Sequence, residues 1–199
     1  MHLRPLTADD QHLIDRALLD PGMMEHLGGA IPPEKSRETF LRQTDPAKAH
    51  TTWARVIVED GVDVGTLALW KNDHDDPASE MGWMVFPESQ ARGLGKRGVQ
   101  MLLDEAWADG RWGAIYAFPS VANDASNAIC RTLGFRLVDT KDFEYQGRTL
   151  MCNHWRIDPP EGAAERLSQA ARGDTSPVMH ERALPRGART RNHVRRSRC

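Results

Sequence analysis

The sequence has no long apolar run and only three cysteines. No apolar stretch approaches the roughly 20 residues that a membrane-spanning helix requires, so we expect no membrane segment. The N-terminal stretch is polar and acidic where a signal peptide would be apolar. Cys130, Cys152 and Cys199 include no CxxC pair, so they indicate neither a disulfide framework nor a zinc site. The cysteine pattern favours a reducing, cytoplasmic location. The histidines lack metal-binding spacings such as HExxH, so we expect no metal.

The 199 residues suit one globular domain with an extension, and the charge is divided unevenly between the two. Residues 159–199 hold nine arginines against four acidic residues, whereas residues 1–158 hold 17 basic against 24 acidic residues. The C-terminal stretch has no aromatic residue and cannot bury enough apolar area to offset its ordering entropy. We therefore expect a folded, acidic domain at 1–158 and a disordered, arginine-rich tail at 159–199.

The hydrophobic patterning predicts an α/β fold around a mixed sheet. Helices are expected from a cap at Thr7 or Asp9 to Leu18, from Pro32-Pro33 to Leu41, after Gly95, and over 123–133. Strands are expected at 53–58, 64–70, 81–86, 112–118, 135–138 and 149–157, with an acidic loop at 142–145 between the last two. The strand at 81–86 is apolar at consecutive positions, as in a strand covered on both faces.

A glycine-containing turn joins the strand at 81–86 to the helix that follows it. Its pattern is Gln90-x-x-Gly93-x-Gly95. Glycines let the backbone approach an anion closely, and the free N–H groups of a helix N-terminus can hold a pyrophosphate. The turn is neither a P-loop nor a dinucleotide fingerprint, and an ordinary strand-to-helix turn explains this pattern equally well.

A second motif adds to the first. The chain contains Val85-x-Pro87 before the glycine turn, then Asn123-x-x-Ser126-Asn127, then Leu133-Gly134-Phe135. In this order the motifs resemble the GNAT superfamily of acetyl-CoA-dependent N-acetyltransferases. Glu80-x-Gly82-Trp83-x-Val85 is similar to the branch that includes ribosomal-protein N-terminal acetyltransferases. The resemblance implies the GNAT fold, a central, mostly antiparallel sheet with two splayed parallel strands and flanking helices.

The resemblance also implies where acetyl-CoA binds. The strand backbone at Met84 and Val85 would pair with the pantetheine arm, as an added strand would. Asn123 would hydrogen-bond that arm, although a helix N-cap is an equally good role for it, and Ser126 and Asn127 would flank the arm. The pyrophosphate would be held by the backbone N–H groups of a continuous run, namely Gln90, Ala91, Arg92, Gly93, Leu94, Gly95 and Lys96.

The implied reaction is direct attack of an amine on the thioester in a ternary complex. The amine must first lose a proton, which a carboxylate can accept directly or through water. Glu80 is the candidate base, with Ser79 as the alternative register and a solvated strand-end acid as the bland interpretation. Where many members carry a tyrosine that protonates the leaving thiolate, this chain has Cys130. The general acid therefore has no assignment.

The acceptor is expected to be a small-molecule amine, a peptide N-terminus or a lysine. In this family the acceptor is recognised by the first two helices and the last loop, which here suggests 26–34, 73–76 and 142–145. A sensor that binds CoA without turnover is the alternative function. Nucleic-acid binding by the tail is not expected, because the tail lacks aromatic residues and the domain is acidic. A monomer and a homodimer both remain open.

Overall fold

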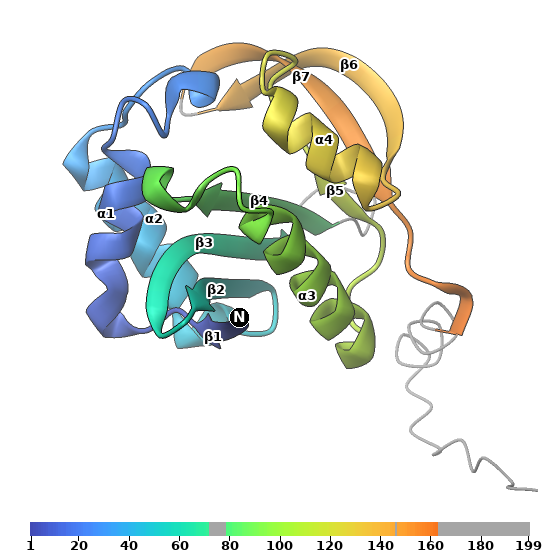
Figure 1. Ribbon diagram of the computed structural model, residues 1–199, viewed down its shortest axis with the longest axis horizontal. Coiled ribbons are helices and arrows are strands. Elements are labelled where there is room, and N and C mark those ends of the chain that lie inside the picture. The colour runs from blue at the N-terminus through green and yellow to red at the C-terminus, as the bar shows by residue number, and fades with distance from the viewer. Residues whose placement is uncertain (72–78, 146, 163–199) are drawn as a thin grey trace, which may run out of the picture.

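The computed structural model describes residues 1–71, 79–145 and 147–162. Seven strands form one sheet in the order β1-β2-β3-β4-β5-β7-β6 (Figure 1). Their bounds are β1 His2–Pro5, β2 Thr52–Glu59, β3 Val62–Lys71, β4 Ser79–Val85, β5 Ile115–Ala117, β6 Arg136–Tyr145 and β7 Arg148–Ile157. The helices are α1 Gln11–Leu18, α2 Pro33–Thr44, α3 Leu94–Asp109 and α4 Asp124–Thr132. Short 3-10 turns are η1 Ala8–Asp10, η2 Glu25–Leu27, η3 Pro46–Lys48 and η4 Pro87–Ser89.

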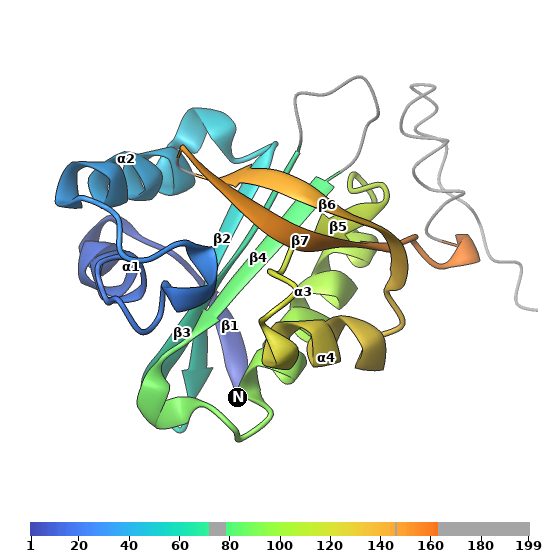
Figure 2. The same cartoon turned by 90° about the horizontal axis from the view of Figure 1, so that it is seen from above.

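The sheet lies between two pairs of helices, as Figure 2 shows. One face, which we call the α3 face, buries Leu67, Leu69, Met81 and Ile115 under α3 and α4. The opposite face, the α1 face, buries Ala54, Val56 and Phe86 under α1 and α2. Side chains alternate between the two faces of a strand, so the odd-numbered residues of β4 lie on the α3 face and the even-numbered residues on the α1 face.

Only β4 and β5 run parallel, and they pair over just two positions, Ser79 with Ile115 and Glu80 with Tyr116. Every other neighbouring pair of strands is antiparallel. Beyond Glu80 the two strands diverge, while β3 stays paired with β4 up to Val85. The expected sheet, mostly antiparallel with two splayed parallel strands, is therefore confirmed.

Position 65 in β3 is a point of close backbone approach. A Cβ atom built on Gly65 would lie 2.3 Å from the carbonyl oxygen of Met84. Real Cβ atoms do not come this close to backbone, so only glycine fits here at this spacing of the strands. Gly65 stands opposite Val85 and thereby sets the register of β3 against β4.

The N-terminal region differs from the expectation at one point, because residues 2–5 form the edge strand β1 before the first helix. Thr7 caps the start of η1, and the carboxylate of Asp10 accepts hydrogen bonds from the Thr7 N–H and hydroxyl at 2.7 and 2.8 Å. Arg4 forms a bidentate ion pair with Asp10 at 2.7 and 2.8 Å. This ion pair holds the pKa of the Asp10 carboxyl well below its usual range.

Three of the predicted strands are wrong in extent. The strand expected at 112–118 covers only Ile115–Ala117, because Trp112 is buried outside the sheet. The acidic loop expected at 142–145 is instead the end of β6, where Phe143 and Tyr145 alternate with exposed Asp142 and Glu144. β4 begins at Ser79 and is only half-buried over residues 82–85, because β5 has turned away there.

Two further expectations concern residues outside the described ranges. The disordered tail at 159–199 lies outside the described residues except for 159–162, and the acidic stretch 73–76 lies outside them entirely. Within the described residues, no helix combines the length and apolarity needed to cross a bilayer.

Candidate active site

The glycine turn delivers a row of backbone donors to the start of α3. After η4, Ala91 has a φ of 57° and Gly93 a φ of 72°, and both lie in the left-handed region. The first internal helix bond runs from the Arg97 N–H to the Gly93 carbonyl. Within the described part of the chain, the backbone N–H groups of 91–96 make no hydrogen bond. The N–H of Gln90, which was expected among the donors, is instead bonded to the carbonyl of Pro87 at 3.2 Å, because η4 closes its turn there. The N–H groups of 91–96 are available to an anion, which the positive end of the helix dipole also favours.

The two glycines of the turn do different things. A Cβ on Gly93 would meet nothing within 4 Å, so its surface is open and its left-handed φ is what calls for glycine. A Cβ on Gly95 would lie 3.2 Å from both Ile129 Cδ1 and Val85 Cγ2. Gly95 therefore lets α3 pack closely on α4 and β4, and its N–H is one of the free donors.

The end of β4 directs peptide groups toward the side from which β5 has diverged. Phe86 donates its N–H to Val64 on β3, and Ser79 donates to Ala114 on the β5 side. The ladder between β3 and β4 has no bulge, so hydrogen-bonding direction alternates between these points. Val85 thus faces away from β3 and Met84 toward it. The Val85 carbonyl also accepts a 2.9 Å hydrogen bond from the Gln90 side chain.

The second motif lies at the start of α4. Asn123 is the N-cap, and its Oδ1 accepts from the Ser126 N–H at 3.0 Å. Asn123 and Ser126 are half-buried. Asn127 is only 2% exposed, and its amide binds four groups of the protein. It donates to the carbonyls of Ser120 and Asn123, and it accepts from Asn153 Nδ2 and Trp155 Nε1.

These bonds show that Asn127 anchors α4 to β7. Its predicted position beside the pantetheine arm stays a prediction, since its amide is already engaged with protein groups. Asn123 keeps its Nδ2 without a hydrogen-bond partner among the described residues, so it can cap the helix and donate outward together. The N-cap interpretation of Asn123 is the one that the structure shows.

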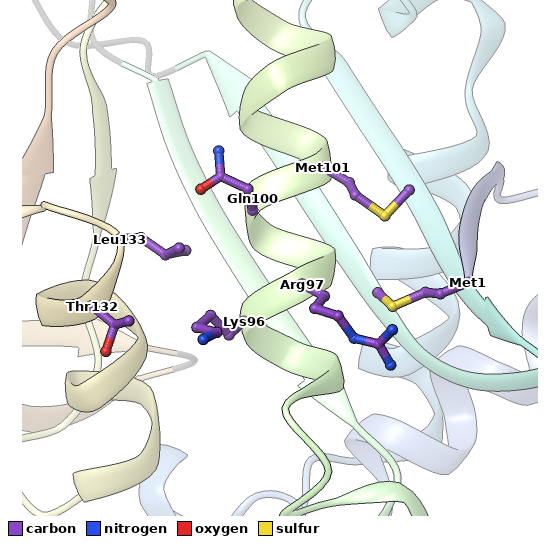
Figure 3. Close-up of a pocket in the computed structure, with 7 residues that line it drawn as sticks. All are labelled: Met1, Lys96, Arg97, Gln100, Met101, Thr132 and Leu133. Carbon is purple, nitrogen blue, oxygen red and sulfur yellow. The ribbon is translucent and has the colours of Figure 1, made fainter.

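A pocket of about 520 Å³ lies next to the glycine turn, around the first turns of α3. In Figure 3, Lys96 and Gln100 extend toward Thr132, the last residue of α4, and Leu133, its C-cap, while Arg97 and Met101 extend to the other side of α3, toward Met1. Arg97 forms a 2.8 Å ion pair with Glu59. Lys96 is exposed beside the free N–H groups, as is Arg92, and both add positive charge to the turn.

Glu80, the candidate base, is half-buried on the α1 face at the last paired position of β4 and β5. Its register partners are Trp70 on β3 and Tyr116 on β5. Ser79, the alternative, is 1% exposed and points to the opposite face, where its hydroxyl finds no partner among the described residues. Of the two candidates for the base, Glu80 is therefore the one on the α1 face, and it lies where β4 and β5 separate.

Cys130 lies within the α3-face core and is fully buried. Burial raises the pKa of its thiol to about 12, so the thiol stays protonated at neutral pH. It cannot serve as a thiolate nucleophile or base. The burial agrees with the interpretation of Cys130 as a small apolar core residue.

Two of the three stretches expected to recognise the acceptor lie side by side. The Arg148 guanidinium, at the tip of the β6–β7 hairpin, donates to the carbonyls of Gly28 and Gly29, the latter at 2.9 Å. This contact joins the stretch 26–34 to the hairpin that carries 142–145, because Arg148 is paired with Tyr145. Figures 1 and 2 show the hairpin reaching the α1–α2 connection. The third stretch, 73–76, lies outside the described residues.

Sequence reasoning missed a set of aromatic residues on the α1 face. Tyr116 stacks on Phe118 with ring centroids 6.0 Å apart, and Phe118 stacks on Phe143 at 4.8 Å. His154 meets Phe118 edge-on at 4.5 Å. The alternation of aromatic and acidic residues over 142–145 could have indicated a strand with Phe143 on one face. No local pattern indicated the contact of His154 with Phe118, because it depends on the pairing of β5 with β7.

Comparison with known families decides what this arrangement is. Residues 1–136 match the family described as Acetyltransferase (GNAT) domain. The chain belongs to the GNAT family. It is an acyltransferase that uses acetyl-CoA. The match covers the glycine turn, the splayed strands and α4.

Solved GNAT structures share the fold. A spermidine N-acetyltransferase from Vibrio cholerae, in complex with CoA and spermine, is 17% identical with a TM-score of 0.67, covering 79% of this chain and 95% of that one. An acetyl transferase from Salmonella typhimurium that modifies the N-terminal serine of ribosomal protein L7/L12 is 18% identical with a TM-score of 0.67, covering 78% and 93%. An aminoglycoside acetyltransferase in complex with coenzyme A is 16% identical with a TM-score of 0.64, covering 83% and 98%.

Proposed function

We propose that this GNAT protein transfers the acetyl group of acetyl-CoA to a primary amine by direct attack in a ternary complex. The backbone N–H groups of 91–96 hold the pyrophosphate, and Glu80 accepts the proton of the amine. One observation carries the proposal, namely that these N–H groups make no bond to the described protein, in a turn where Ala91 and Gly93 adopt the left-handed conformation.

The protein fits the cosubstrate at three further places. The peptide groups of Val85 face the diverging side of β4, where a pantetheine amide can pair with them. The free amide nitrogen of Asn123 stands at the start of α4. The pocket beside Lys96 and Gln100 adjoins the pyrophosphate turn and can receive the nucleotide end.

The chemistry assigned to this chain is proton transfer and orientation. Acetyl-CoA supplies the thioester carbonyl carbon that the amine attacks. The nitrogen–carbon bond forms, the carbon–sulfur bond breaks, and CoA leaves as the thiolate. The amine proton passes to the Glu80 carboxylate directly or through a water molecule. Cys130 is buried with its pKa raised, so water protonates the thiolate.

The decisive experiment removes one backbone donor without removing a helix. Lys96 is exposed at the third position of α3, where its N–H makes no bond within the helix, so proline removes no helix hydrogen bond. Lys96→Pro deletes the side chain and the N–H, whereas Lys96→Ala deletes only the side chain. By calorimetry with CoA, we expect Lys96→Pro to bind about tenfold or more weakly than Lys96→Ala, since a hydrogen bond to a charged group contributes about 1.5–3 kcal/mol.

Circular dichroism melting of both variants checks that α3 is intact. Equal CoA affinity of the two folded variants, or no heat with the parent protein, would contradict the proposal. Transfer itself is measured as thiol release from acetyl-CoA with a panel of amines.

A further inference from the structure

A row of half-buried side chains crosses the α1 face of the sheet at the point where β4 and β5 separate. Its members, from β3 to β6, are Trp70, Glu80, Tyr116, Phe118 and Phe143. Residues opposite one another on neighbouring strands place their side chains on the same face and within contact reach. Trp70 stands opposite Glu80, and Glu80 stands opposite Tyr116.

The row offers ring surface around one carboxylate. Phe118 and Phe143 lie nearly parallel, with 18° between their planes, and His154 closes their edge. His154 is 9% exposed, and burial lowers its pKa, so it presents a neutral ring at neutral pH. Within the row, Glu80 is the carboxylate, and the other four members contribute aromatic surface.

Gly82 leaves space beside Glu80. It lies two positions further along β4 on the same face, and a Cβ built on it would come within 3.6 Å of the Trp70 ring. A side chain at position 82 would therefore stand between the Trp70 ring and the surface next to Glu80. Glycine keeps the ring accessible on that side.

The cations beside the row already have partners. Arg156 donates to the Tyr116 hydroxyl at 3.0 Å and is paired with Asp158. Lys141 lies 4.0 Å from Asp139 on the strand that carries Phe143. Arg148, next in line beyond Phe143, is bound by backbone carbonyls. A second ammonium group laid along the row would meet rings instead of a second carboxylate of the row, and it would be desolvated there.

We infer that the acceptor amine carries an aromatic or large apolar group, which lies on the rings of Phe118 and Phe143 while its nitrogen reaches Glu80. This inference rests on the proposed function and names the acceptor class for that same site. Ring surface stabilises an apolar substituent by removing it from water, and π faces attract an ammonium before it is deprotonated. A polyamine or a polyhydroxylated amine gains little from such a wall, because its polar groups find few partners there.

A matched pair of amines tests the inference by thiol release from acetyl-CoA. 2-Phenylethylamine and ethylamine differ by the ring alone. Burying a ring of phenylalanine size is expected to lower KM for 2-phenylethylamine about tenfold or more below that for ethylamine. Spermidine is expected to have the highest KM of the three.

Two variants test whether the ring of 2-phenylethylamine lies against Phe143. Phe143→Ala, on the exposed strand β6, is expected to lower the ratio of KM for ethylamine to KM for 2-phenylethylamine about tenfold. Leu137→Ala is the control, because Leu137 is 48% exposed on the same strand and pairs with Trp155, which faces α4. It is expected to leave the ratio as in the parent protein. Calorimetry with CoA on both variants reports that the cosubstrate site is intact.

The outcomes separate this inference from the proposed function. Thiol release with equal KM values for the two amines, preference for spermidine, or an unchanged ratio in Phe143→Ala would overturn the inference and leave acetyl transfer standing. If CoA does not bind and no amine releases thiol, the proposed function fails and the acceptor class fails with it.

Discussion

The side-chain amide of Gln90 donates a hydrogen bond of 2.9 Å to the carbonyl oxygen of Val85. This bond ties the glycine turn to the end of β4, so the pyrophosphate donors and the pantetheine-facing peptide groups are held in one frame. The Val85 carbonyl keeps a second lone pair for another donor. The link thus positions the two halves of the proposed cosubstrate site relative to each other.

Gln90→Ala should weaken CoA binding by about threefold to tenfold. The hydrogen bond that is lost stabilises the folded turn by about 0.5–1.5 kcal/mol, and without it the turn is no longer held to β4. The measurement is calorimetry with CoA. Gln43→Ala on α2, away from the turn, serves as the control. Unchanged affinity in Gln90→Ala would show that the turn keeps its position without this bond.

Glu80→Gln should lower kcat/KM about 100-fold or more, as expected for removal of a general base, and should remove the acidic limb of the pH–rate profile. Glu105→Gln is the control, since Glu105 is half-buried on α3 and pairs with Arg55. The measurement is thiol release as a function of pH. A variant with unchanged kcat/KM and an unchanged profile would exclude Glu80 from the mechanism.

Ala91→Gly should raise the free energy of unfolding by up to about 1 kcal/mol. Ala91 is held at a φ of 57°, which costs an L-residue about 1–2 kcal/mol, partly offset by the greater unfolded-state entropy of glycine. Urea denaturation checks this. The matched change Ala128→Gly, in the interior of α4, should instead lower stability by about 1 kcal/mol. Destabilisation by both changes would contradict the expected strain at position 91.

Cys130 and Cys152 should resist thiol reagents in the native protein. Both are fully buried, and burial raises the pKa of each thiol, which disfavours the reactive thiolate. Dithionitrobenzoate on a Cys199→Ser variant should label neither thiol at neutral pH and both after denaturation. Labelling of the native protein at the rate of a free cysteine would count against the packing described for α4.

Stability should fall as the pH drops below about 6.5. Burial and the nearby Lys141 lower the pKa of His154 in the folded protein, while Asp139 raises it less. The unfolded state therefore binds more protons between the folded pKa and the unfolded value of about 6.5, so stability is complete above 6.5 and is lost as pH falls through the folded pKa.

Urea denaturation at pH 7.5 and 5.5 measures this dependence. His154→Leu should show a smaller difference between the two conditions, whereas His12→Gln, a change at an exposed helix position, should keep the full difference. An identical difference in parent and His154→Leu would assign the pH dependence to other groups.

The sequence was sufficient where local chemistry determines the conformation. Gly93 predicted the turn because a left-handed residue before a helix favours glycine, and the strands around Gly61 followed from their apolar patterns. It was insufficient where tertiary partners decide. β1 has four residues, too few for a pattern, and is a strand because β2 pairs with it.

The candidate site also contains residues that a local motif predicts and residues that depend on distant partners. The motif around Asn127 indicated a residue beside the cofactor, but Trp155 and Asn153, some 26 residues or more away, determine what its amide bonds. The aromatic row depends on the registers of β3, β4, β5, β7 and β6 together. A one-residue error in any of them would move a member to the other face.

The close approach at Gly65 has a consequence for the chemistry far along the same strand pair. A larger residue there would push on the Met84 peptide, and β4 could escape only by sliding or tilting against β3. Sliding by one position would exchange Glu80 for one of its apolar or hydroxyl neighbours at the α1 face. The absence of a methyl group at position 65, opposite the end of β4, thus keeps the Glu80 carboxylate in place near the start of that strand.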